Sequence, residues 1–355
     1  MRDVIDQLDA WTADGRRSAV ATVVSVKRSA PRPPGAKMAV ADDGAVAGAV
    51  SGGCVEGAVV AVAEEVLAGG PPRLLHFGIA DEEAWDVGLP CGGEIDVWVG
   101  TLDDAPGRAF AQLAREDGRG ALVTRLDDGA HLLVRPGAQR LGGLGDAALD
   151  DEAALVAEEL AWAERSERRT LTGDVEVLVD VTAPAPRLII FGAVDHSAAL
   201  CTLARAARWR PFVVDPRGRF ATRERFPDAE AIVVKWPAEA FAELGGIDRA
   251  TSIAVLTHDP KLDDAALEIA LASDAGYIGA MGSRRAQEAR RERLLERGLT
   301  DEDLERISAP IGLDLGGVTA EETALSIMAE LVAVRRGHPG GRLRDASGRI
   351  HEVGA

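Results

Sequence analysis

Two of the three cysteines in the sequence stand beside glycine pairs, where a thiol can meet another molecule. Cys54 lies in SGGCVEG and Cys91 in GLPCGGE. Each is followed closely by a carboxylate, from Glu56 and Glu94 respectively. Neighbouring glycines let another molecule approach the backbone, and a helix expected to begin at Cys54 would favour its thiolate form. Both cysteines are therefore predicted to handle sulfur or a soft metal. The alternative is that each is a small apolar residue beside a turn.

The spacing of these cysteines argues against a structural zinc centre. Cys54 and Cys91 are 37 residues apart, and neither has a histidine or cysteine at the short spacing that zinc sites use. The third cysteine, Cys201, lies in AALCTLARAA, a predicted helix of the second half. It is predicted to fill the core there.

The segment KRSAPRPPGAKM gathers four cations into eleven residues of a chain whose net charge is −18. These cations are Lys27, Arg28, Arg32 and Lys37, and three prolines stiffen the segment between them. Arginine and lysine side chains on a stiff loop can bind phosphate or another anion. The segment therefore predicts an anion site, with a solvated surface loop as the alternative.

A glycine turn near the start of the second half, GAVDHS, matches a dinucleotide-binding turn only in part. Gly192 begins the turn, and Asp215 ends the next strand, where a ribose-binding carboxylate is expected. Val194 and Ser197 replace two glycines of the pattern G-x-G-x-x-G. Asp195 would add negative charge beside a phosphate. Ordinary NAD binding is therefore in doubt.

Further polar groups follow later strands of the same half, in THD at 257–259 and GSRR at 282–285. Parallel sheets bind ligands at the carboxyl ends of their strands. Ser283 and Arg284 would begin a helix, which makes an anion seat. His258 and Asp259 either contribute to this site or only cap and orient a loop.

The second half reads as a doubly wound parallel sheet because short apolar runs alternate with helix-length segments. A proline-punctuated linker, VTAPAP, precedes it and marks a domain boundary near residue 181. The predicted strands are Leu188–Phe191, Phe212–Asp215, Ala231–Val234, Ser252–Thr257 and Tyr277–Gly279.

The first half contains an internal repeat, residues 15–100 and 118–180. GAVSGGCVEGAVVAVAEE aligns without gaps on GGLGDAALDDEAALVAEE, and EIDVWVG matches DVEVLVD. The shared unit is predicted as strand, loop, hairpin, helix and strand. Only the first copy carries the long basic loop and Cys54, so function is expected on that copy. Chance likeness between two Ala/Val-rich helices is the alternative. The predicted domains are 1–180, 181–337 and a tail, 338–355.

Composition excludes several classes of partner. A net charge of −18 without a basic stripe argues against nucleic acid and anionic membranes. The start, MRDVIDQLDAW, lacks the basic and apolar regions of a signal peptide. Three cysteines make no disulfide framework, so a cytoplasmic location is expected.

Taken together, these motifs resemble the XdhC/CoxI family, accessory proteins of xanthine dehydrogenase and related molybdenum hydroxylases. The resemblance runs in order from about residue 15 to 337 and departs at GAVDHS, where many members are closer to GAGH. It implies a duplicated α/β XdhC/CoxI domain followed by a Rossmann-like domain with a doubly wound parallel sheet. The motifs that carry it are SAPRPPGAKM, SGGCVEG, GLPCGGEIDVWV, VVDPR, LTHD, YIGAMGSRR and PIGLDLGGVTAEETALSIMAEL.

The resemblance implies a chaperone for molybdenum cofactor, either molybdopterin or its cytosine dinucleotide form, rather than a turnover enzyme. Such a chaperone protects the cofactor while a cysteine desulfurase supplies sulfur for its sulfido ligand, and then inserts it into an apo-hydroxylase. A homodimer is implied as well. Cys54 would contact the molybdenum, with Cys91 as its companion.

Two other functions stay open. One is an NAD(P)-binding oxidoreductase that grips a ribose through Asp215, and the other is a scaffold that tethers partners. The residues predicted to bind the cofactor are Arg32, Lys37, Ser51, Gly52, Gly53, Cys54, Glu56, Gly192, Ala193, His196, Asp215, His258, Asp259, Gly282, Ser283 and Arg284.

Overall fold

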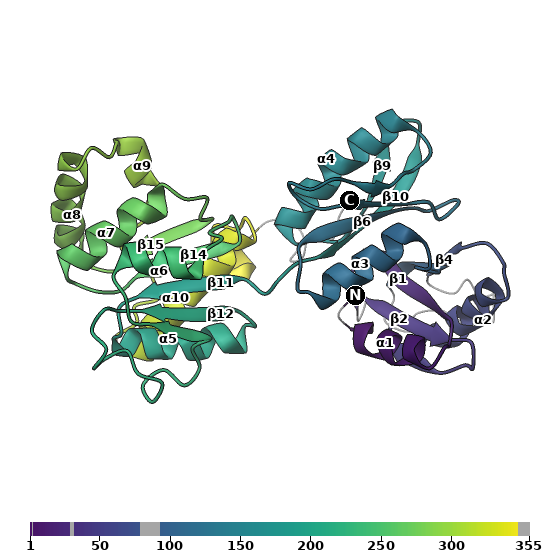
Figure 1. The fold of residues 1–355 in the computed structure, drawn as a ribbon, viewed down its shortest axis with the longest axis horizontal. Coiled ribbons are helices and arrows are strands. Elements are labelled where there is room, and N and C mark those ends of the chain that lie inside the picture. Colours follow the sequence, from purple (N-terminus) through teal and green to yellow (C-terminus); the bar gives the residue numbers. More distant parts are fainter. Residues whose placement is uncertain (2, 29–31, 79–92, 347–355) are drawn as a thin grey trace. The chain divides into compact units, whose positions relative to one another are not determined.

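A computed structural model describes residues 1, 3–28, 32–78 and 93–346. The chain divides into two compact units, Met1–Pro184 and a second that begins at Ala185, and each is described by itself (Figure 1). Among the described residues, no helix is long and apolar enough to cross a membrane.

The first half of the first unit is an antiparallel sheet of five strands in the order β3-β2-β1-β5-β4. Helix α2 packs on one face, where Val59 and Ala63 meet Val23 and Ile95 of the sheet. The elements are α1 (Ile5–Ala13), β1 (Ser18–Lys27), β2 (Lys37–Ala41), β3 (Val46–Gly48), α2 (Glu56–Leu67), β4 (Arg73–Phe77) and β5 (Glu94–Gly100).

The second half of this unit repeats the same succession of elements. Its five strands have the order β8-β7-β6-β10-β9, which is the order of the first sheet element for element. Helix α4 covers one face, as α2 does in the first half. The elements are α3 (Ala105–Arg115), β6 (Gly120–Arg125), β7 (His131–Val134), β8 (Leu141–Gly142), α4 (Ala147–Ala163), β9 (Glu167–Leu171) and β10 (Val175–Thr182).

The two halves share a core on the faces that α2 and α4 leave uncovered. Val20 and Ala39 of the first sheet and Leu122 and Leu133 of the second belong to one buried cluster with helices α1 and α3. A second, smaller buried cluster, which includes Trp98, also contains side chains from both sheets. Burial of aliphatic and aromatic side chains from both halves joins them into one compact unit.

The second unit is a parallel sheet of six strands in the order β13-β12-β11-β14-β15-β16. In chain order this is 3-2-1-4-5-6, the strand order of a Rossmann fold. Helices α5 and α10 pack on one face and α6, α7, α8 and α9 on the other (Figure 1). The strands are β11 (Arg187–Phe191), β12 (Arg210–Val214), β13 (Ala231–Val233), β14 (Thr251–Val255), β15 (Tyr277–Ala280) and β16 (Ile307–Ser308). The helices are α5 (Asp195–Ala206), α6 (Pro237–Leu244), α7 (Pro260–Leu271), α8 (Arg284–Glu296), α9 (Asp301–Glu305) and α10 (Ala320–Arg335), followed by the short helix η1 (Leu343–Asp345).

The predicted α/β class and the parallel sheet are confirmed. All five predicted strands of the second unit are present, with ends displaced by one or two residues. The sixth strand, Ile307–Ser308, was not predicted because two residues carry no periodicity. The helices and strands that the predicted repeat lacks are α1, α3, β4 and β9.

Candidate functional site

Three loops of the first half leave the same end of its sheet. Antiparallel pairing places Lys27 opposite Glu94 and Met38 opposite Gly48, so β1 and β3 end where β2 and β5 begin. The pairing of Phe77 with Ile95 brings the end of β4 to the same place. We call this end of the sheet the loop edge. The basic loop, the SGGC loop and the segment between β4 and β5 all start or end on it.

The SGGC loop is held together by Glu56, the first residue of α2. Its carboxylate accepts a hydrogen bond from the backbone N–H of Ser51 at 2.8 Å and from the Ser51 hydroxyl at 2.7 Å. It also accepts from the N–H of Val55 at 3.2 Å. The Ser51 hydroxyl in turn accepts from the N–H of Cys54 at 3.2 Å. The loop is therefore organised before any ligand arrives.

These contacts keep the Glu56 carboxylate ionised. Burial alone would raise its pKa, but the hydrogen bonds from the Ser51 hydroxyl and N–H and from the Val55 N–H outweigh burial and lower the pKa. The predicted role of Glu56 was ligand binding; in this geometry both of its oxygens serve the loop. Gly53 has a φ of +106°, which favours glycine, and the space beside its Cα is open.

The two described cysteines have opposite environments. Cys54 is a free thiol, partly exposed, one residue before the N-cap of α2, and it packs at the margin of the first core. Cys201 is fully buried in the second unit, and burial raises its pKa to about 12. Cys201 is thus core filling, as predicted, whereas Cys54 can meet a partner. Cys91 lies outside the described residues.

Lys37 does not contribute to a surface anion site. Its side chain is 1% exposed, and its ammonium bonds Asp180 of the second half at 2.5 Å and the Thr22 hydroxyl at 3.1 Å. A buried charge needs such a partner. The prediction of Lys37 as an anion ligand is therefore wrong in this conformation. The sequence could not show this because Asp180 is remote along the chain.

The other cations of the basic loop are nearer to solvent. Lys27 pairs with Glu94 at 3.3 Å across the loop edge, and Arg32 pairs with Asp3 at 2.5 Å. Arg28 is exposed and has no ion pair within the described part of the chain. Among the described residues, Arg28 is therefore the predicted cation whose charge is not neutralised by an ion pair.

Sequence reasoning missed a polar cluster beside the loop edge. His76 Nδ1 lies 2.7 Å from Asp96 Oδ1, and the other oxygen of Asp96 accepts from the Ser25 hydroxyl at 2.6 Å and from Arg168 at 2.8 Å. Antiparallel register brings these residues together: Asp96 pairs with His76 on one side and with Ser25 on the other. Such register cannot be read from the spacing of single residues.

Asp96 is an ionised carboxylate that holds an exposed imidazole. Burial would raise its pKa, but the hydrogen bonds from Ser25 and His76 and the charge of Arg168 hold the pKa below its usual range. The Ser25 hydroxyl bonds the carboxylate and not the imidazole, so the cluster is not the serine–histidine relay of a hydrolase. It orients His76 on the sheet face opposite to α2.

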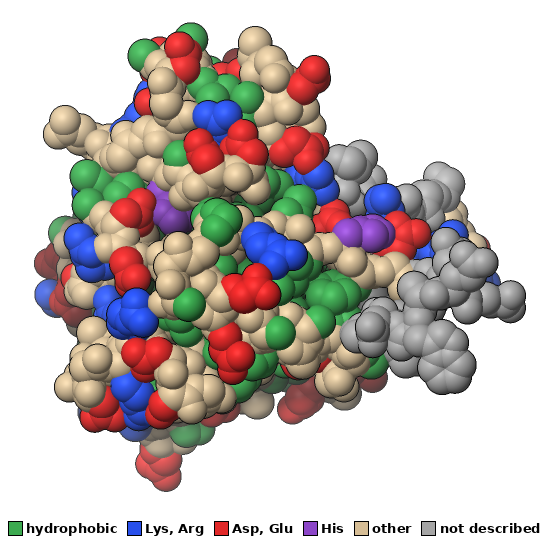
Figure 2. Space-filling view, turned by 90° about the vertical axis from the view of Figure 1, so that its right-hand side faces the viewer, with side chains coloured by type: hydrophobic (Ala, Val, Ile, Leu, Met, Phe, Trp, Pro, Cys, Tyr) green, Lys and Arg blue, Asp and Glu red, His purple; other side chains and the backbone are tan. Residues whose placement is uncertain are grey.

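No broad basic area is visible on the face that Figure 2 draws. Acidic and basic side chains alternate there, with hydrophobic side chains scattered between them (Figure 2). Within the described ranges, no three His, Cys, Asp or Glu side chains gather as metal ligands.

In the second unit, the glycine turn is closed by the protein itself. Gly192 has a φ of +116°, and a Cβ there would lie 2.6 Å from a methyl carbon of Thr257. The N–H of Ala193 donates to Asp215 at 2.8 Å. Asp215 also accepts from the Arg217 guanidinium at 2.7 and 2.9 Å. The carboxylate predicted to bind a ribose therefore braces the turn instead.

The negative charge of Asp195 beside this turn is neutralised by an arginine of the same unit. Arg225 bonds Asp195 at 2.9 Å and the carbonyl of Ala193 at 3.1 Å. Burial would raise the pKa of Asp215, but the hydrogen bonds from Arg217 and from the Ala193 N–H lower it. His196 is half-buried in the first turn of α5. This arrangement disfavours a pyrophosphate at the turn, where a dinucleotide would place it.

In the turns that follow β14 and β15, two of the predicted site residues cap the next helix. Asp259 caps α7 through the N–H of Lys261 at 3.0 Å, and Ser283 caps α8 through the N–H of Ala286 at 3.3 Å. His258 is exposed. Gly282, with a φ of +139°, makes the turn before α8.

Arg284, the first residue of α8, is exposed, as is Arg285 beside it, and neither has an ion pair within the described part of the chain. Cations at a helix N-terminus are unfavourable, so these charges favour an anionic guest.

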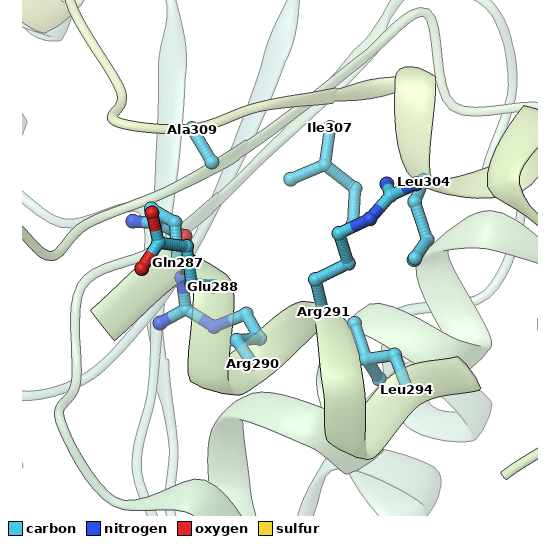
Figure 3. Close-up of a pocket in the computed structure, with 8 residues that line it drawn as sticks. All are labelled: Gln287, Glu288, Arg290, Arg291, Leu294, Leu304, Ile307 and Ala309. Carbon is cyan, nitrogen blue, oxygen red and sulfur yellow. Dashed lines mark hydrogen bonds between the residues drawn. The ribbon is translucent and has the colours of Figure 1, made fainter. Parts of the chain in front are cut away.

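Helix α8 also borders a pocket of about 210 Å³ at the far edge of the sheet (Figure 3). Arg290 lines it, but its guanidinium already bonds Asp263 at 2.9 Å and the carbonyl of Met281 at 3.0 Å. Only its Nε lacks a partner. The pocket lining is Gln287, Glu288, Arg290, Arg291, Leu294, Leu304, Ile307 and Ala309.

Comparison with known proteins gives the chain a family. Residues 188–331 match the XdhC Rossmann domain, and residues 11–78 match the XdhC and CoxI family. The molybdenum cofactor insertion chaperone PaoD of Escherichia coli is 30% identical over 322 residues, covering 90% of this chain and 84% of that protein.

Two further proteins are similar over nearly their whole length. A probable xanthine dehydrogenase subunit of Bacillus subtilis is 26% identical over 338 residues, covering 93% of this chain and 96% of that protein. A crystal structure described as a xanthine dehydrogenase from Bacillus halodurans has a TM-score of 0.63 at 24% identity, covering 96% of this chain and 97% of that one, and so shares the fold. The chain belongs to the XdhC and CoxI family.

Proposed function

We propose that the protein is a molybdenum cofactor chaperone that binds the cofactor, shields it and inserts it into a molybdenum hydroxylase of the xanthine dehydrogenase type. The observation that carries this proposal is the partly exposed Cys54 thiol on an organised glycine loop. The name of the relative at 30% identity, a molybdenum cofactor insertion chaperone, supports the same assignment.

The residues fit the chemistry of this cofactor. When bound, molybdenum with dithiolene and sulfido ligands supplies a soft centre, and soft centres prefer thiolate donors. Cys54 would hold that end, while Glu56 fixes the loop through Ser51 and Val55. The phosphate end needs cations, and Arg28 in the first unit and Arg284 in the second are exposed.

The finer steps belong to the same proposal. A cysteine desulfurase would supply sulfur while the cofactor is held, and the apo-hydroxylase would take the cofactor because it binds it more tightly. We also propose a cytoplasmic location and a homodimer. Both molybdopterin and its cytosine dinucleotide form satisfy the chemistry of Cys54 and the arginines.

An NAD(P)-dependent oxidoreductase is the less favoured function. Asp215 would have to release Arg217 and the Ala193 N–H to bind a ribose. The Asp215 side chain is fully buried, so loss of its hydrogen-bond donors would be costly.

A transfer assay tests the proposal. Full-length protein loaded with molybdenum cofactor is mixed with a purified apo-hydroxylase, and hydroxylase activity is followed. We expect faster and more complete activation than with free cofactor, and loss of molybdenum from the chaperone in the same period. Equal activation by free cofactor, with molybdenum left on the chaperone, would refute the insertion role.

A further inference from the structure

Aromatic and aliphatic side chains are exposed where β12 and β13 end. Phe220 is 49% exposed, Trp236 51% and Val234 48%. Val234 and Trp236 follow β13 directly, and Phe220 lies in the loop after β12. The carboxyl ends of parallel strands are where sheets of this type bind ligands. Three large exposed side chains thus lie at the edge where sheets of this type bind ligands.

The loop that carries Phe220 is fixed against both strand ends. Arg217 is anchored on Asp215, and its guanidinium carbon lies 5.1 Å from the centre of the Phe220 ring. A Cβ at Gly218 would lie 3.3 Å from a methyl carbon of Val234. The loop thus lies along the end of β13, and the exposed ring of Phe220 packs against the Arg217 guanidinium.

The guanidinium of Arg225 contacts both the Phe220 ring and the glycine turn. Arg225 bonds the carbonyl of Ala193 at 3.1 Å, and its guanidinium carbon lies 5.9 Å from the centre of the Phe220 ring. Phe220 therefore lies near the crevice outside β11 and β12. In a Rossmann fold, the nucleobase of a bound dinucleotide lies on that side of the crevice, and the reacting end of the ligand lies on the other side.

The residue before Phe220 in the chain is a further cation, Arg219. Arg219 is exposed and has no hydrogen bond or ion pair within the described residues. It belongs to DPRGRFATRER, which holds four arginines in a strongly acidic protein. Since Arg225 and Asp195 close the turn, a phosphate in this region would meet Arg219 instead.

We propose that this edge, formed by Phe220, Val234, Trp236 and Arg219, binds a planar heterocycle that carries a phosphate. The ring would stack on Phe220 and Trp236, and Arg219 would bind the phosphate. A pterin and a cytosine base share this chemistry. The proposal rests on the proposed function for the identity of the natural ligand, which is then the organic end of the molybdenum cofactor.

Two probes and a phosphate-free control test this site on the full-length protein by calorimetric titration. The probes are cytidine diphosphate and 6-hydroxymethylpterin diphosphate, and cytidine is the control. Stacking on an aromatic side chain contributes about 1–3 kcal/mol per base, so Phe220→Ala and Trp236→Ala should each weaken binding by roughly 5- to 150-fold. Arg219→Gln should weaken both diphosphates and leave cytidine unchanged.

Leu155→Ala is the matched control, because Leu155 is exposed on α4 in the first unit. It should bind both probes like the wild type. Tighter binding of one diphosphate than of the other shows whether the site prefers the cytosine base or the pterin. The proposal is overturned if neither probe binds, or if the Phe220 and Trp236 variants, shown to be folded by circular dichroism, bind normally. Cofactor retention without probe binding would refute this site alone, whereas probe binding without cofactor retention would refute the proposed function alone.

Discussion

The surroundings of a cysteine decide whether its thiol can take part in chemistry. Cys201 is buried among aliphatic side chains, and its raised pKa keeps it protonated at neutral pH. Cys54 is partly exposed on a loop whose backbone is tied by Ser51 and Glu56. The two positions provide a site variant and a matched control in one chain.

Cys54→Ser is expected to weaken retention of molybdenum cofactor. A hydroxyl has the shape of a thiol but is a poor donor to soft metals and sulfur. We expect a loss of at least about tenfold in affinity, which corresponds to about 1.4 kcal/mol. The measurement is equilibrium dialysis of the loaded protein with molybdenum analysis. Cys201→Ala should retain the cofactor, and normal retention by Cys54→Ser would rule out a role for the thiol.

Asp96 predicts a pH dependence of stability. Its pKa is lowered in the folded protein, so its ionised form contributes stability above the unfolded value of about 3.9. That contribution is lost as the pH falls through the folded pKa. Asp96→Asn should therefore destabilise the protein at pH 7, and the difference from wild type should shrink below about pH 4.

Urea unfolding at a series of pH values measures this difference. Asp103→Asn is the control, because Asp103 is exposed. A difference for Asp96→Asn that persists unchanged down to pH 3 would contradict the assigned charge of Asp96.

At the scale of elements, a carboxylate in each half of the first unit binds the loop that precedes its helix, and the residues that do so differ between the halves. Glu56 at the start of α2 accepts from the N–H of Ser51 at 2.8 Å. Asp150 at the aligned position of α4 accepts from the N–H of Leu144 at 2.6 Å. Both carboxylates fold a loop back onto a helix start. Only the loop in the first half carries a cysteine.

Glu56→Gln and Asp150→Asn separate the support of a helix from the support of a ligand. Each change removes a charge that accepts backbone N–H groups, so each should cost about 1–2 kcal/mol of stability. Only Glu56→Gln should also weaken cofactor retention, because it loosens the loop around Cys54. Thermal unfolding and molybdenum analysis measure the two effects. Equal retention by the two variants would contradict the role given to the SGGC loop.

A buried ion pair fastens the loop edge of the first half to the second half. Lys37 begins β2, its ammonium bonds Asp180 of β10, and its carbonyl accepts from the N–H of Ala49 at 3.1 Å, just before the SGGC loop. Lys37→Met leaves the buried Asp180 carboxylate without its ion-pair partner, and only the weak hydrogen bond from the Ser166 hydroxyl at 3.4 Å remains, so the change should cost about 3–5 kcal/mol. Adding Asp180→Leu should recover much of that loss.

Urea unfolding of the two single variants and the double variant measures the coupling. A Lys37→Met variant that loses less than about 1 kcal/mol would show that the pair is not buried as described.

Local sequence patterns predicted the parallel sheet but not the tertiary pairings. Apolar runs such as Leu188–Phe191 identify buried strands without knowledge of their neighbours. The burial of Lys37 and the contact of His76 with Asp96 could not be predicted, because folding and strand register alone bring Asp180 and Asp96 to these side chains. A run of cations looks the same in sequence whether its members face solvent or a buried carboxylate.

At the scale of the whole molecule, we propose that the first unit arose from two copies of one α/β motif. The two sheets have the same strand order. Gly48 and Gly142 occupy aligned positions, and a Cβ at either would lie 2.3–2.4 Å from a backbone oxygen, of Lys37 and of His131 respectively. One copy carries the thiol loop, while the other supplies Arg168 and Asp180 as supports.

The second unit also has a supporting part and an exposed part. Its glycine turn is braced by Asp215 and closed by Arg225, yet its carboxyl edge has exposed aromatic rings and arginines that make no ion pair within the described part of the chain. A protein that carries a large guest needs several such contacts and no hydride-transfer machinery. We therefore propose that the whole chain is a carrier, with sulfur chemistry in the first unit and recognition of the organic end in the second.

The most direct test is the content of the full-length protein after purification from a host that makes molybdenum cofactor. Elemental mass spectrometry gives the molybdenum, and the fluorescence of the oxidised pterin gives the organic part. We predict molybdenum and pterin in roughly equal amounts, both approaching the amount of chain. Protein that carries no more of either than an unrelated protein purified from the same cells would contradict the central claim.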